Sequence, residues 1–403
     1  MRVFIFDLLP YAEHLDYLKV NGELPWPLGK RYFKPEVAVK TYAEHLDAWE
    51  AMEEHGFDGV AFNEHHGTPY GLMNSPNLLA ASIAQRTKKL RLLMYGNLLP
   101  LHEPLRLAEE LAMLDCLSGG RLEAGVARGA PREYRIYNRP LSESRARFDE
   151  AFEIIKKAWT EESFSYEGKF NSYKDVAIWP RPVQQPHPPV WVPVMSKDSI
   201  EWAARNNVGI TPGGGPNPGA RGDIIRHYAK IHAEHGRKVT PDHFNIQVQC
   251  YVADSKEQAI DEIAPYQMYL FNTLFPFDHG QSMEEIRKEG YFSASSRDHL
   301  RSGPPQANLP GGGASGPWGG GMTRDRVKAM AQGAAIGTAD EVAEKIIAEC
   351  ESAGAGTVML MCNGGAMPQE MFLNQVKRIG KDVLPRLKAH KVTRVKFAEG
   401  VAD

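Results

Sequence analysis

The stretch FNEHHG, residues 62–67, places a glutamate and two adjacent histidines directly after an apolar run. Such residues suit a metal site, a proton-transfer site, or a structural corner tied by hydrogen bonds. Successive side chains of a strand point to opposite faces, so a chelating pair on a strand would be His-x-His. The zinc motif HExxH is also absent, because His102-Glu103 runs directly into Pro104. We therefore predict that no metal is bound here.

The same stretch lies at the carboxyl end of a predicted strand, where barrel enzymes gather their chemistry. An imidazole changes charge near neutral pH, so His65 or His66 is expected to transfer a proton or to hydrogen-bond a ligand. Glu64 could orient that imidazole, although strand alternation makes the opposite face equally plausible. A histidine that only ties down a loop is the alternative.

A second group of residues suggests an anion site. Arg128 ends the predicted strand RLEAGVARG, where its guanidinium would offer a fork of donors to a phosphate or carboxylate. Arg145 stands near the start of a predicted helix, and Ser196 and Ser199 bracket another helix start, where free N–H groups favour an anion. A structural ion pair for Arg128 and simple capping by the serines are the alternatives. No Rossmann or P-loop glycine motif is present.

The whole chain has an ordinary composition, with 42% hydrophobic and 24% charged residues. A formal charge of -3 provides no basic field, which argues against a nucleic-acid partner. No apolar run is long enough to cross a membrane. The four cysteines are widely separated and form no CxxC pair, so we expect free thiols and a cytoplasmic protein.

Short apolar runs alternate with amphipathic helical stretches along the chain, which is typical of βα units and a parallel sheet. The predicted strands are residues 3–9, 59–65, 90–99, 121–129, 189–194, 208–213, 244–253 and 357–364. Eight strands are what an α/β (β/α)₈ barrel, the TIM barrel, requires. Between them, Phe148, Phe152, Ile155 and Trp159 form one apolar stripe that should pack on the sheet.

Two segments interrupt this alternation without resembling independent domains, so residues 1–403 are expected to form a single barrel domain with insertions. The first is about 163–188, with aromatic strand-like pieces and a Pro-rich end. The second is about 266–330 and contains the Gly-rich stretch 303–321. A long Gly-rich segment is either a lid over an active site or disordered, and Trp318 slightly favours the lid.

These features together resemble the bacterial luciferase-like flavin-dependent monooxygenases over most of the chain. The resemblance rests on long ordered motifs: FNEHH, LLPLHEPLRLAEELAMLDCLSGGRLEAGVARG, SYEGKFNSYKDVAIWPRPVQQPHPPVWVPVMSKDSIEWAA and IGTADEVAEKIIAECESAGAGTVMLMCNGG. It implies a (β/α)₈ barrel that binds FMN as FMNH₂. It also implies O₂ as co-substrate, a flavin C4a-peroxide, a separate NAD(P)H:flavin reductase, and one oxygen atom inserted into a small organic substrate. A homodimer through PNLLAASIAQRT and EPLRLAEELAMLDCL is implied as well.

The resemblance also implies roles for individual residues. Arg128, Arg145, Ser196 and Ser199 would hold the FMN phosphate, and Asn97 would lie beside the flavin ring. His65 would be the active-site histidine, and from the residues themselves Glu64 is the candidate catalytic neighbour.

Met195 departs from the luciferases that emit light, which have a glutamate there, so light emission is not implied. The substrate and the reaction subtype are not specified by any motif. Two other functions remain open: a deazaflavin-dependent hydride-transfer oxidoreductase of the same barrel group, and a non-catalytic flavin-binding protein.

Overall fold

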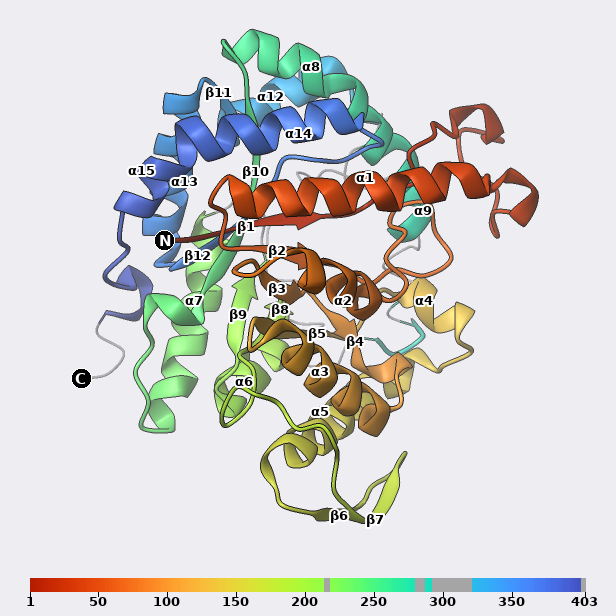
Figure 1. The fold of residues 1–403 in the computed structure, drawn as a ribbon, viewed down its shortest axis with the longest axis vertical. Coiled ribbons are helices and arrows are strands. Elements are labelled where there is room, and N and C mark those ends of the chain that lie inside the picture. The colour runs from red at the N-terminus through yellow and green to blue at the C-terminus, as the bar shows by residue number, and fades with distance from the viewer. Residues whose placement is uncertain (214–217, 280–285, 287, 292–320, 400–403) are drawn as a thin grey trace.

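Parallel strands surround the centre of the molecule, and helices cover their outer side (Figure 1). The computed structural model describes residues 1–213, 218–279, 286, 288–291 and 321–399. The central strands are β1 (Arg2–Asp7), β2 (Gly59–Phe62), β3 (Arg91–Met94), β5 (Leu122–Ala127), β8 (Val190–Val194), β9 (Gly209–Pro212), β10 (Asn245–Val252) and β12 (Thr357–Met361). Each of the eight predicted strands overlaps one of them.

The strand order closes the sheet into a barrel. Hydrogen-bonded neighbours run β10-β12-β1-β2-β3-β5-β8-β9, and every one of these pairs is parallel. A parallel bridge between Ile210 and Phe244 then joins β9 to the residue before β10. Two short strands extend the sheet: β4 (Asn97–Leu98) pairs with β5, and β11 (Ala335–Gly337) pairs with β10. The predicted (β/α)₈ fold is confirmed.

Alternation along the strands separates two apolar layers. Val3 and Ile5 belong to the layer between strands and helices, whereas Phe4 and Phe6 join Trp191 in a second cluster inside the barrel. Gly125 permits a close approach near the mouth, because a Cβ there would lie 1.5 Å from the carbonyl oxygen of Met94.

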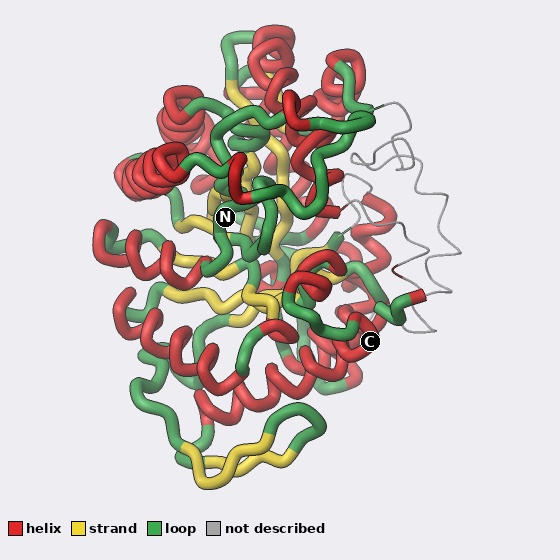
Figure 2. Tube along the Cα trace, turned by 90° about the vertical axis from the view of Figure 1, so that its right-hand side faces the viewer, coloured by secondary structure: helices red, strands yellow, loops and turns green. Residues whose placement is uncertain are grey.

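The helices form an outer ring that is visible from the side in Figure 2. They are α1 (Pro35–Glu54), α2 (Pro76–Arg86), α3 (Pro104–Ser118), α4 (Pro131–Ile136), α5 (Ser144–Thr160), α6 (Lys197–Asn206), α7 (Pro218–Glu234), α8 (Lys256–Tyr269), α9 (Phe275–His279), α12 (Arg324–Gly333), α13 (Ala339–Ala353), α14 (Gln369–Arg378) and α15 (Leu384–Ala389). The predicted apolar stripe of α5 is buried throughout. Because Arg145 follows the first residue of α5, it lies at the helix start as predicted.

The two predicted insertions differ in how much of them can be described. Residues 163–188 contain an antiparallel hairpin of β6 (Phe164–Glu167) and β7 (Ser172–Val176), which projects beside α5 (Figure 1). Within 266–330 the chain continues from α8 through a π-helical turn, Leu270–Leu274, into α9. The predicted lid at 303–321, including Trp318, lies outside the described residues except for Gly321.

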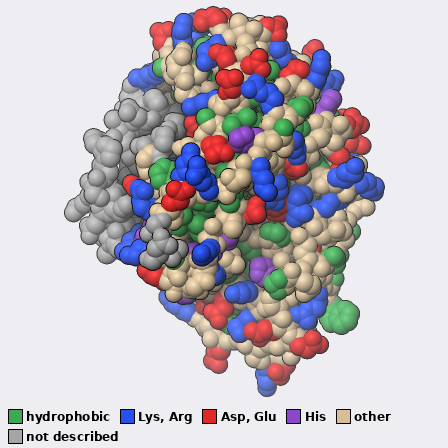
Figure 3. All heavy atoms as spheres, turned by 90° about the vertical axis from the view of Figure 1, so that its left-hand side faces the viewer, with side chains coloured by type: hydrophobic (Ala, Val, Ile, Leu, Met, Phe, Trp, Pro, Cys, Tyr) green, Lys and Arg blue, Asp and Glu red, His purple; other side chains and the backbone are tan. Residues whose placement is uncertain are grey.

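The surface is mixed in charge. On the face shown in Figure 3, lysine and arginine side chains alternate with aspartate and glutamate, and no large area of one sign is visible. None of the described helices is both long and apolar enough to cross a membrane.

Candidate active site

Glu64 is the centre of a buried hydrogen-bonded cluster at the carboxyl end of the barrel. β2 ends at Phe62, so the residues that follow it are free of strand alternation. One carboxylate oxygen, Oε1, lies 3.0 Å from Nε2 of His66 and 2.8 Å from Nε2 of His102. The other, Oε2, accepts from the Leu98 amide at 3.2 Å. The carboxylate is thus bonded on every side by donors.

These contacts determine how the cluster titrates. Burial by itself would raise the pKa of Glu64, but hydrogen bonds and charge from His102 and His66 outweigh it and lower the pKa to about 2. Burial lowers the pKa of His102, and the hydrogen bond and charge of Glu64 more than reverse that, so the pKa is raised. Glu64 is therefore a permanent anion at neutral pH, and it favours the imidazolium form of His102.

His65 points away from this cluster. Its Nδ1 lies 3.3 Å from Oε1 of Glu133, and its ring packs edge-on against Tyr70 with centroids 4.9 Å apart. Glu64 therefore orients His66 and His102 instead of His65, which is the second of the two arrangements that alternation had left open. His65 is paired with Glu133, because the chain turns directly after β2.

Glu133 was not identified from the sequence. It lies in α4 and is buried, and its other oxygen, Oε2, accepts from the backbone N–H of Ala130 at 2.6 Å. A glutamate in the first turn of a helix is usually read as a cap, and nothing in the local sequence links it to His65. Only the fold brings the end of β2 and the start of α4 together.

The predicted anion-binding residues come together at the start of α6. Nη2 of Arg145 donates to the carbonyl oxygen of Asp198 at 2.8 Å, which joins the start of α5 to the first turn of α6. Ser196 is the N-cap of α6: its Oγ accepts from the amide of Ser199 at 3.3 Å, and the Ser199 hydroxyl donates back to the Ser196 carbonyl at 2.7 Å.

Arg128 belongs to the same charged group. Its Nη1 donates to the carbonyl oxygen of Tyr291 at 3.0 Å, and its guanidinium carbon lies 4.1 Å from the centre of the Tyr291 ring. The pKa of Arg145 is lowered, first by burial and also by the charge of Arg128, against the opposing charge of Asp149. The two guanidinium groups therefore repel each other across the site. An anion between them would relieve that repulsion.

Asn97 is completely buried in β4, beside the Glu64 cluster. Its Nδ2 lies 3.3 Å from Oε2 of Glu64 and 3.2 Å from Oδ1 of Asn77. Within the described part of the chain its Oδ1 has no hydrogen-bond partner. A buried amide oxygen without a donor is costly unless a ligand supplies one. This residue stands immediately after the cis peptide Tyr95-Gly96.

His102 and Asn77 were also missed as parts of the site. His102 had been considered only as half of a zinc motif, and Asn77 only as part of a helix. His102 contacts Glu64, and Asn77 contacts Asn97. Because the partners are distant in sequence, no spacing rule could pair them. Across the described ranges, no group of three or more potential ligand side chains is arranged to hold a metal ion.

The chain matches the luciferase-like monooxygenase family over residues 24–357. It is 28% identical, over 61% of this chain and 68% of the relative, to the oxygenase component of the flavin-dependent trigonelline monooxygenase of Acinetobacter baylyi. The crystal structure of monooxygenase RslO1 from Streptomyces bottropensis superposes with a TM-score of 0.69 at 27% identity, covering 96% of this chain and 99% of that one. The oxygenating constituent of 3,6-diketocamphane monooxygenase from Pseudomonas putida, solved with FMN, shares the fold at 18% identity, with a TM-score of 0.69 and coverage of 96% and 98%.

Proposed function

Since the chain belongs to the luciferase-like monooxygenase family, we propose that it is the oxygenase component of a two-component system. The chain is an enzyme, an oxidoreductase of the flavin-dependent monooxygenase type. In the proposed reaction, FMNH₂ from a separate NAD(P)H:flavin reductase and O₂ are used to insert one oxygen atom into a small organic substrate. We place this reaction in the cytoplasm.

The observation that carries the proposal is the meeting of Arg128, Arg145 and the start of α6 near the mouth of the barrel. Two mutually repelling guanidinium groups beside a helix N-terminus suit a dianion such as the FMN phosphate. Ser196 and Ser199 would add hydroxyl donors once their capping bonds are exchanged for the phosphate. The residues present therefore fit the group.

The other candidate residues would work at the ring end of the cofactor. Reduced FMN, when bound, supplies the electrons that activate O₂. His65 would hold or deliver a proton there, with the Glu133 carboxylate, 3.3 Å from its Nδ1, orienting the imidazole. Asn97 would offer its buried amide oxygen to a donor on the flavin ring, while Glu64 fixes the orientation of that amide.

We also propose a homodimer through α2 and α3. Both helices expose large apolar side chains, with Leu78 71%, Met113 54% and Leu117 44% exposed. Exposed apolar residues on two helices that pack side by side are what a helical dimer interface needs.

Stopped-flow spectroscopy tests the proposal directly. The protein is mixed with anaerobic FMNH₂ and then with oxygenated buffer, and absorbance is followed. We expect a long-lived species whose spectrum differs from both reduced and oxidised FMN, and whose decay is hastened by a substrate. Oxidation at the rate of free FMNH₂ would contradict the proposal. Binding of a reduced deazaflavin in its place would then favour hydride transfer, and tight FMN binding without any such species would favour flavin storage.

A further inference from the structure

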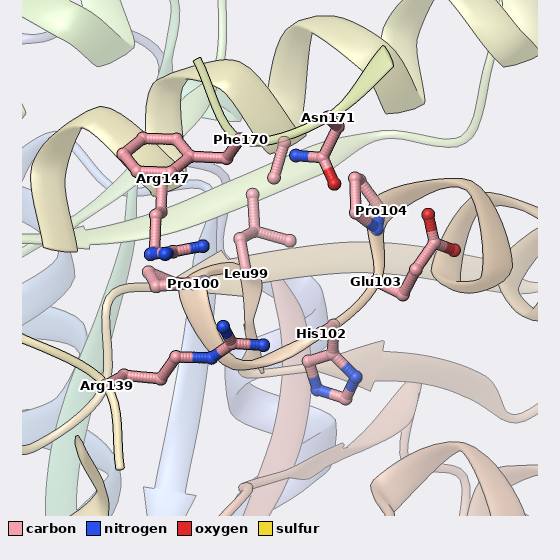
Figure 4. A pocket seen from close by; sticks show the side chains of 10 residues that line it. Leu99, Pro100, His102, Glu103, Pro104, Arg139, Arg147, Phe170 and Asn171 are labelled. Carbon is pink, nitrogen blue, oxygen red and sulfur yellow. The ribbon is translucent and has the colours of Figure 1, made fainter. Parts of the chain in front are cut away.

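A cavity of about 140 Å³ lies beside the loop that follows β4, and His102 of the Glu64 cluster is one of its lining residues (Figure 4). Its walls come from that loop and the start of α3, from the turn after α4 that carries Arg139, from α5, and from the tip of the β6–β7 hairpin. Leu99, Pro100 and Phe170 supply apolar surface, while Arg139 and Arg147 contribute guanidinium groups. None of the candidate FMN ligands lines it.

The two arginines are held differently. Arg147 is fixed: its Nε and Nη2 donate to Oε2 of Glu143 at 2.9 and 2.7 Å, and its guanidinium carbon lies 4.1 Å from the centre of the Phe170 ring. Arg139 is exposed, and no carboxylate of the described chain pairs with it. The cavity thus offers one guanidinium that is held in place by Glu143 and Phe170, and one that forms no ion pair with any described residue.

The acidic residue in the lining does not cancel this charge. Glu103 accepts from the backbone N–H of Arg106 at 2.5 Å and from the hydroxyl of Tyr173, so its carboxylate is already engaged. Figure 4 shows it on the opposite side of the cavity from Arg139 and Arg147. The arginine side therefore attracts an anion.

His102 connects the cavity to the barrel mouth. Its side chain lines the cavity, and its Nε2 lies 2.8 and 3.0 Å from the two oxygens of Glu64. Glu64 in turn contacts Nδ2 of Asn97. A molecule bound in the cavity would contact the same hydrogen-bonded chain that ends at the proposed flavin ring.

We propose that this cavity is a second binding site, which takes a small organic carboxylate with an apolar body of about one ring. The carboxylate would bind the guanidinium groups of Arg139 and Arg147, since a guanidinium presents parallel donors to that group. The apolar body would rest on Leu99, Pro100 and Phe170. The size fits, because a cavity of ~150 Å³ accommodates benzene.

Isothermal titration calorimetry on the full chain without flavin tests the site, with benzoate as the probe. We expect benzoate to bind once per chain. The neutral isostere benzamide should bind on the order of tenfold more weakly, because it loses the charge-assisted hydrogen bonds. Inorganic phosphate should also bind more weakly, because it has no apolar body. Equal binding of benzoate and benzamide, or no benzoate binding, overturns the proposal.

Variants then locate the bound probe. Arg139→Ala should weaken benzoate binding on the order of tenfold, whereas Arg226→Ala, which removes an exposed arginine of α7, should leave it unchanged. Arg145→Ala separates this site from the proposed FMN site, because it should reduce FMN binding and leave benzoate binding intact. Loss of benzoate binding in Arg145→Ala but not in Arg139→Ala would place benzoate at the barrel mouth and refute the second site.

Discussion

Glu123 and Glu64 are both fully buried carboxylates, but they lie at opposite ends of the barrel and are neutralised by different partners. At the amino end, Oε1 of Glu123 lies 2.5 Å from Nη1 of Arg2 and 2.5 Å from Nε of Arg91, and Oε2 accepts from Nε1 of Trp191 at 2.7 Å. At the carboxyl end, Glu64 is bonded chiefly by histidines.

The difference separates a structural role from a functional one. Guanidinium groups keep their charge at every pH that a protein meets, so the partners Arg2 and Arg91 of Glu123 stay cationic. Imidazoles gain and lose protons near neutrality, so the Glu64 cluster can change its charge state. The Glu64 cluster lies at the end of the barrel where enzymes of this fold carry out their chemistry.

The largest expected effect is on stability, from Glu123→Gln. Removing the carboxylate leaves two arginines partly buried without their counter-ion, which should lower the free energy of unfolding by about 3 kcal/mol or more. Urea denaturation measures this, and FMN affinity of the folded fraction should be unchanged. A variant as stable as the parent, or one that folds normally but does not bind FMN, would contradict the structural role assigned to Glu123.

The next prediction concerns how the stability lost in Glu64→Gln depends on pH. The folded pKa of Glu64 is about 2, below its usual 4.5, so the unfolded chain takes up this proton first as pH falls. Its contribution to stability is therefore complete above pH 4.5 and is lost as pH falls from 4.5 toward 2. His102 has a raised pKa, so its contribution is complete below its usual 6.5 and is lost as pH rises through the folded value.

The free energy of unfolding of the parent should therefore exceed that of Glu64→Gln most between pH 4.5 and pH 6.5, by roughly 2–3 kcal/mol. The free energies of unfolding of the parent and the variant should converge as pH falls below 4.5. Urea denaturation from about pH 6 down to about pH 3.5 tests this. A difference that stays constant with pH would contradict the lowered pKa of Glu64.

Arg128→Ala tests the proposed FMN site at the mouth. Loss of one charge-assisted contact to a phosphate should weaken FMN binding by about 2 kcal/mol, or roughly thirtyfold. Arg205→Ala, an exposed arginine on α6, is the matched control and should bind FMN normally. Fluorescence titration of FMN gives both values. Unchanged affinity in Arg128→Ala would remove this residue from the phosphate site.

How far the sequence predicted the molecule depended on how local each signal was. Strand patterns and helix starts are local signals, so every barrel strand was located, and Arg145 was placed correctly at the start of α5. Arg128, Arg145, Ser196 and Ser199 were selected because each ends a strand or starts a helix, and the closed barrel brings those ends together.

The contacts of the two adjacent histidines could not be predicted in the same way. Their directions depend on β2 ending at Phe62, and a boundary shift of one residue reverses the faces. Glu133 and His102 come from other loops, so their pairing with His65 and Glu64 is set only by barrel closure.

The smallest effect is expected from Tyr137→Phe, at the outer edge of the Glu64 cluster. The hydroxyl of Tyr137 lies 3.0 Å from Nδ1 of His66, whose Nε2 contacts Glu64. Because Tyr137 is 44% exposed, water can take the place of its hydroxyl. The free energy of unfolding, measured by urea denaturation, should therefore fall by about 0.5 kcal/mol. Tyr32→Phe, which removes an exposed hydroxyl that accepts from Arg31, is the control. A loss above about 2 kcal/mol, as expected for an unsatisfied buried group, would mean that the mouth cluster is as sealed from solvent as the Glu123 cluster.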